Sequence, residues 1–110
     1  MPRRLTPLSK PALADAVATA DQRALTKHYL ALLQAIAPGA SVEVRVPPYA
    51  AIQCIEGVRH TRGTPPAVVE MTAEVWLDLA RGERTWAEAL ASGQVHASGE
   101  RADLSAFLPL

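Results

Sequence analysis

The spacing of apolar residues changes at Pro38-Gly39, and this change limits the fold more than any other feature of the sequence. Upstream, within residues 12–36, apolar side chains recur with the 3.6-residue period of an amphipathic helix. Downstream, the three valines of residues 41–46 alternate with polar residues, as in a strand with one buried face. The chain therefore combines helix and strand. The helical stripe consists of Leu25, Tyr29, Leu32, Leu33 and Ile36.

Capping and turn residues divide the chain into short elements. Asp21 is a candidate N-cap, so residues 12–36 form either two helices or one bent helix. Thr72 is another candidate cap, and Thr85 with Glu88 has the Thr-x-x-Glu spacing of a capping box. The predicted elements after the first helical region are strands at 41–46, 49–55 and 67–71, a helix at 73–80, a helix starting at Thr85, a strand at 94–98 and a helix at roughly 101–107.

This order predicts an α+β fold with an antiparallel or mixed sheet. The third strand is expected to be central, because Val68 and Val69 are both apolar. Residues 1–11 hold three prolines and three basic residues, and we predict that they form a flexible N-terminal arm. Residues 12–110 are then a single domain, since a chain of 110 residues is too short for two separate cores.

Charge and hydropathy argue against several classes of protein. The 11 basic and 11 acidic side chains cancel, whereas proteins that bind nucleic acids or membrane surfaces usually carry a basic surplus. The most apolar helical stretch, residues 25–36, is interrupted by polar residues and is too short to span a bilayer. No apolar leader segment follows the basic start of the chain. We therefore expect a cytoplasmic protein with no nucleic-acid partner and no integral membrane association.

The second half of the chain resembles a known family. A helix with "EVWLDLARGE" is followed by a short helix with "TWAEALASG", a strand with "QVHASGE" and a closing "DLSAFLPL". This order is similar to the sterol carrier protein 2 (SCP2) family, with Gly82, Gly93 and Gly99 at the corresponding stops and Glu100 where that family commonly has aspartate. The stretches "SVEVRVPPYAAIQCIEG" and "RHTRGTPPAVVE" resemble the bacterial sterol-carrier-like orthologue group of actinobacteria, which extends the resemblance to roughly residues 20–110.

The resemblance implies a fold and two alternative functions. SCP2-like domains have a twisted sheet of about five strands with helices over one face, of which four strands are predicted here. Relatives bind fatty acyl chains, sterols or other lipids in an apolar tunnel between sheet and helices. Related domains also serve as accessory modules on other enzymes, including mycothiol-dependent ones. The chain is therefore expected to be a non-enzymatic lipid-binding or carrier protein, or else a protein–protein interaction module that docks on an enzyme or forms a homodimer.

Apolar side chains on the predicted strands and helices are candidates to line such a tunnel. The alternative is that they fill an ordinary core, which any domain of this size needs. The apolar chain end could close over the sheet, cap a tunnel mouth or join a partner. The candidate lining residues are Val44, Ile52, Trp76, Leu79, Trp86, Leu90, Phe107 and Leu108.

A basic loop between the second and third strands is a candidate polar contact. It carries Arg59, His60 and Arg62, and arginine forms bidentate hydrogen bonds with carboxylate or phosphate groups. These residues could meet an anionic head group. The alternative is a solvated loop whose arginines pair with nearby glutamates.

No residue pattern indicates catalysis, a metal or a cofactor. His28, His60 and His96 lie far apart, without the spacing of a metal site. Cys54 lies on the apolar face of its strand, where a thiol is usually inert. We therefore expect no catalytic residue and no cofactor.

Overall fold

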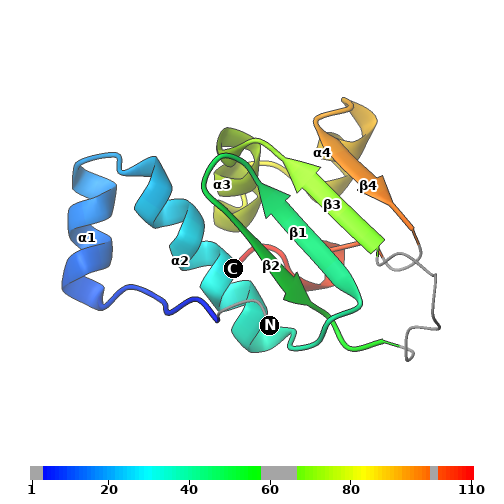
Figure 1. Cartoon of the computed structure of the whole chain (residues 1–110). Coiled ribbons are helices and arrows are strands. Elements are labelled where there is room, and N and C mark those ends of the chain that lie inside the picture. Colours follow the sequence, from blue (N-terminus) through cyan, green and yellow to red (C-terminus); the bar gives the residue numbers. More distant parts are fainter. Residues whose placement is uncertain (1–3, 58–66, 100–101) are drawn as a thin grey trace.

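The computed structural model describes residues 4–57, 67–99 and 102–110 (Figure 1). It confirms the α+β order, with two helices before the sheet. Within these residues four strands pair in the order β2-β1-β3-β4, and the β1–β3 pair is parallel while the other two pairs are antiparallel. The elements are α1 (Lys10–Ala18), α2 (Gln22–Ile36), β1 (Val42–Val46), β2 (Ala50–Cys54), β3 (Ala67–Met71), α3 (Ala73–Arg81), α4 (Trp86–Ala91), β4 (Val95–Ser98) and the 3-10 helix η1 (Ser105–Phe107).

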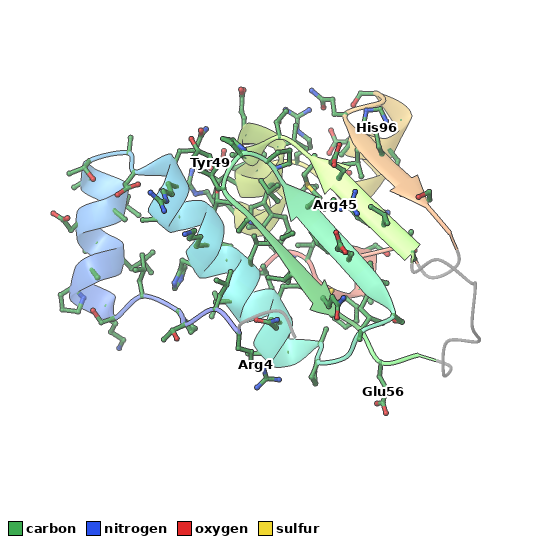
Figure 2. All side chains as sticks on the ribbon, viewed as in Figure 1. Arg4, Arg45, Tyr49, Glu56 and His96 are labelled. Carbon is green, nitrogen blue, oxygen red and sulfur yellow. The ribbon has the colours of Figure 1, made fainter. Side chains whose placement is uncertain are left out.

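One face of the sheet is covered and forms the core. In Figure 1, α3 and α4 lie behind the sheet. The valines of β1 are fully buried and therefore belong to this covered face. The opposite face carries Arg45, Glu70 and His96 in one row across β1, β3 and β4. Figure 2 labels Arg45 and His96 on this row. The alternation expected from the sequence is therefore confirmed, and β3 is an interior strand as predicted.

Helix α2 connects the N-terminal segment to the sheet. The Asp21 carboxylate accepts the Ala24 N–H at 3.0 Å and starts α2, which resolves the open choice in favour of two helices. The buried amide of Gln34 accepts the Leu5 N–H at 3.1 Å and donates to the Gln53 carbonyl of β2 at 3.4 Å. At the other end of α2, the Tyr49 hydroxyl donates to the Gln22 side chain at 3.1 Å (Figure 2).

The segment expected to be a flexible arm lies against α2. In addition to the Leu5 contact, the Leu8 N–H donates to Nδ1 of His28 at 2.9 Å. His28 is buried and packs edge-on to Tyr29, with ring centroids 5.1 Å apart. Helix α1 starts at Lys10, so the last residues of the expected arm are helical.

His28 gives the fold a pH dependence that can be measured. Burial lowers the pKa of His28 below its ordinary value of 6.5, and the contact with Leu8 requires an unprotonated Nδ1. Below pH 6.5 the unfolded chain therefore binds more protons than the folded one, and stability falls as the pH falls through the lowered folded pKa. We expect the thermal midpoint to drop between pH 7 and pH 5. His28→Gln should remove most of that drop, and an unchanged pH profile in this variant would contradict the assignment.

The closing helix expected at 101–107 is shorter in the structure. Within the described residues 102–110, the helical part is limited to a 3-10 turn at Ser105–Phe107. The Asp103 carboxylate accepts the Ser105 N–H at 2.8 Å, and this local hydrogen bond competes with helix formation. The same bond lowers the pKa of Asp103. Leu104 is fully buried and fixes the segment on the core.

Candidate ligand-binding site

Helices α3 and α4 and the chain end form a pocket of about 350 Å³. Its wall is mainly apolar, and polar atoms enter from the α3–α4 connection and from η1. The pocket is partly open to solvent. The lining residues are Leu79, Gly82, Arg84, Thr85, Trp86, Ala87, Ser105, Leu108 and Pro109.

Local capping fixes the two helices of this pocket. Thr72 accepts the Val75 N–H and starts α3, and Gly82 ends it in the left-handed conformation with φ of 78°. Thr85 and Glu88 form the predicted capping box, with hydrogen bonds of 3.0 and 3.1 Å. These bonds lower the pKa of Glu88. Because α4 begins right after Thr85, Trp86 lies at its first turn and is buried against the core.

The chain end closes the third side of the pocket. The Leu110 N–H donates to the Ala80 carbonyl at 2.8 Å, so the last residues of the chain lie beside the end of α3. A Cβ at Gly82 would lie 3.4 Å from Cβ of Pro109, which shows how closely the two segments approach. Phe107, Leu108 and Leu110 are partly buried against the domain's own core. The apolar end therefore packs on this chain.

Among the described residues, Arg84 is the charged one in the pocket wall. Its Nη2 donates to Oδ2 of Asp78 at 3.1 Å, and its Nη1 donates to the side-chain oxygen of Gln94. The Nε atom is buried and has no hydrogen-bond partner among the residues that the structure describes. The guanidinium is thus held from two sides and retains unused donors.

Arg84 also lines a second, more polar pocket. This hollow has a volume of about 470 Å³ and lies where β3, α3 and the start of β4 meet. Its charged and polar wall includes Glu70, Glu74, Gln94 and His96. Within the described ranges, no group of three or more histidine, cysteine, aspartate or glutamate side chains is arranged to hold a metal ion.

The sequence matches one family over most of its length. The family model described as bacterial SCP ortholog matches residues 18–110. The chain belongs to this family. The predicted resemblance to the SCP2-like bacterial group is thereby confirmed. No curated protein matches the chain.

The SCP-ortholog chain brings together only part of the predicted lining set. Leu79, Trp86 and Leu108 meet in the 350 Å³ pocket. Val44 and Ile52 are buried on the covered face of the sheet. Phe107 is partly buried on the core without lining this pocket.

The two tryptophans of the SCP-ortholog chain have different environments. Trp76 is fully buried between α3 and α2, and its indole N–H donates to the Thr26 carbonyl at 3.2 Å. It belongs to the packed core and does not line the pocket that contains Trp86. For Trp76 the ordinary-core alternative describes the structure better than the tunnel interpretation.

Leu90 differs from the expectation of an inward side chain. The buried stripe of α4 runs through Trp86 and Ala89, so Leu90 lies at its edge and is 43% exposed. The predicted polar contacts Arg59, His60 and Arg62 lie outside the described residues. Their role stays a prediction.

Several pocket residues were not anticipated from the sequence. Arg84, Ser105 and Pro109 carry no periodic or motif signal, and only the packing of the chain end on α3 brings them to Trp86. Cys54 is fully buried, and burial raises the pKa of its thiol to about 11. Such a thiol is a poor nucleophile at neutral pH, in agreement with its assignment to the core.

No described helix of the chain is both long and apolar enough to cross a membrane.

Proposed function

We propose that this SCP ortholog is a non-enzymatic binding or carrier protein for a lipid or another small apolar or amphipathic molecule. The observation that carries the proposal is the apolar pocket between α3, α4 and the chain end. Its volume of about 350 Å³ lies in the range of small-molecule sites, roughly 300–1,000 Å³. Membership of the SCP family supports the same class of ligand.

Trp86 makes the proposal directly testable by fluorescence. It lines the pocket, whereas Trp76 lies in the core. A brominated acyl chain bound in the pocket should quench the emission of Trp86 in a saturable way. Trp86→Phe should remove most of the saturable quenching, because only the core Trp76 remains.

Filling the pocket should block binding. Ala87 is exposed and lines the pocket, so Ala87→Phe places a large side chain in the ligand's volume without disturbing the core. We expect the dissociation constant for an acyl ligand to rise at least about tenfold, equal to about 1.4 kcal/mol. Ala91→Phe is the matched control, since Ala91 is exposed on the same helix and does not line this pocket. Equal affinities in the two variants would place the ligand elsewhere.

A docking module is the second candidate function. In that case the exposed Leu90 on α4 is the apolar side chain that we would expect to contact the partner. The absence of any saturable acyl ligand, together with a dimer in light scattering that Leu90→Glu dissociates, would favour this function over the carrier.

A further inference from the structure

Arg84 stands where the apolar pocket and the polar pocket meet. It lines the 350 Å³ pocket beside Trp86 and the 470 Å³ pocket beside Gln94. An amphipathic molecule needs such a boundary, with an apolar wall for its chain and a polar wall for its head. The inference below rests on the proposed function and concerns the head group.

The geometry makes Arg84 a fixed donor. Asp78 and Gln94 hold two of its nitrogens, and the side chain remains 28% exposed. Guanidinium has five N–H donors, so an acceptor on a ligand can bind without breaking either contact. A fixed donor loses little conformational freedom when a ligand binds.

The charges around Arg84 disfavour an anionic head. Asp78 already neutralises the guanidinium at 3.1 Å. The polar pocket adds the exposed carboxylate of Glu74 and that of Glu70, whose charge Arg45 partly offsets from the neighbouring strand. Glu88 is also close enough for the charge of Arg84 to contribute to the lowered pKa of Glu88, behind the hydrogen bonds with Thr85. A carboxylate placed here would compete with Asp78 and meet further negative charge.

We propose that the ligand of this site carries an uncharged head group with hydroxyl or ester oxygens, of the kind found in a monoacylglycerol. Its acyl chain lies against Leu79, Trp86 and Leu108. A head-group oxygen accepts a hydrogen bond from Arg84, and its hydroxyls donate to the carboxylates of the polar pocket. This choice differs from the anionic head group that the basic loop would select.

Three probes with the same ten-carbon chain test the head group: monodecanoylglycerol, decanoate and decylamine. Their affinities are measured at pH 7 and about 0.15 M salt, where surface charge effects are screened beyond about 8 Å. We expect monodecanoylglycerol to bind at least about tenfold more tightly than decanoate, or about 1.4 kcal/mol. Arg84→Gln should reduce that affinity about tenfold. Arg81→Gln, an exposed arginine at the end of α3 that lines neither pocket, should leave it unchanged.

The outcomes separate the head-group inference from the carrier function. Decanoate binding as tightly as monodecanoylglycerol overturns the inference and leaves the carrier function standing. Tightest binding of decylamine also overturns the inference, because the negative charge of the carboxylates around Arg84 would then select the ligand by itself. Binding of none of the three overturns both. If Arg84→Gln does not fold, Glu74→Gln replaces it as the test variant, because Glu74 is exposed and the Arg84–Asp78 pair stays intact. It should narrow the preference over decanoate, and an unchanged preference in this variant counts against the inference.

Discussion

Trp76→Ala is expected to lower the free energy of unfolding by about 3–5 kcal/mol, the usual range for removing a buried tryptophan. Trp76 is fully buried and has the largest side chain among the fully buried residues described. It lies at the contact between α2 and α3, and its indole N–H donates to the Thr26 carbonyl at 3.2 Å. Alanine would leave a cavity at this contact and remove the hydrogen bond. Since domains of this size are stable by only about 5–15 kcal/mol, the loss is a large fraction of the total.

Urea denaturation followed by circular dichroism measures this loss. Trp76→Phe retains most of the ring volume, and we expect it to be clearly more stable than the alanine variant. Leu90→Ala is the surface control, because Leu90 is 43% exposed, and its effect should stay within about 0.5 kcal/mol. A loss below about 1 kcal/mol for Trp76→Ala would mean that the α2–α3 contact collapses around the missing ring or is looser than described.

The same residue shows where sequence patterns stop being informative. Trp76 and Trp86 both lie on apolar stripes of short helices, so the sequence offered the same role for each. Their environments differ through contacts between segments far apart in the sequence, which periodicity does not encode.

Local features were predictable because neighbouring residues determine them. The cap at Thr72, the stop at Gly82 and the capping box at Thr85 and Glu88 are all present as expected. The sequence did not predict that β1 and β3 pair in parallel, since buried and exposed residues alternate in the same way in parallel and antiparallel strands. The position of Arg84 between two pockets also depends on tertiary packing, through its contacts with Asp78 and Gln94.

Gly39→Ala is expected to have the second large effect, a loss of more than about 4 kcal/mol, which is exceptional for a single substitution. A Cβ at this position would overlap the backbone carbonyl of Ile55 and the amide nitrogen of Glu56. Gly39 also has φ of 146°, which side chains with a Cβ rarely adopt. The substitution therefore adds backbone strain to a direct steric overlap.

The overlap with Ile55 cannot be relieved by a small shift. The Ile55 carbonyl accepts hydrogen bonds from Ser41, from its N–H at 3.0 Å and from its hydroxyl at 2.6 Å. The Ile55 N–H donates to the Ala37 carbonyl at 2.7 Å. These bonds join the end of α2 to the end of β2, so moving Ile55 away from a new methyl group would break the contacts that position both elements.

Gly93→Ala separates steric overlap from backbone strain. Gly93 has φ of 74°, and a Cβ there would meet nothing within 4 Å, so only the left-handed strain of about 1–2 kcal/mol applies. Denaturant midpoints of the two variants, compared at unchanged m-value, give the difference. Since Gly39→Ala adds the overlap with Ile55, it should lose at least about twice as much stability as Gly93→Ala. Equal losses would show that Ile55 moves away from the added methyl group, and that its hydrogen bonds do not hold it against Gly39.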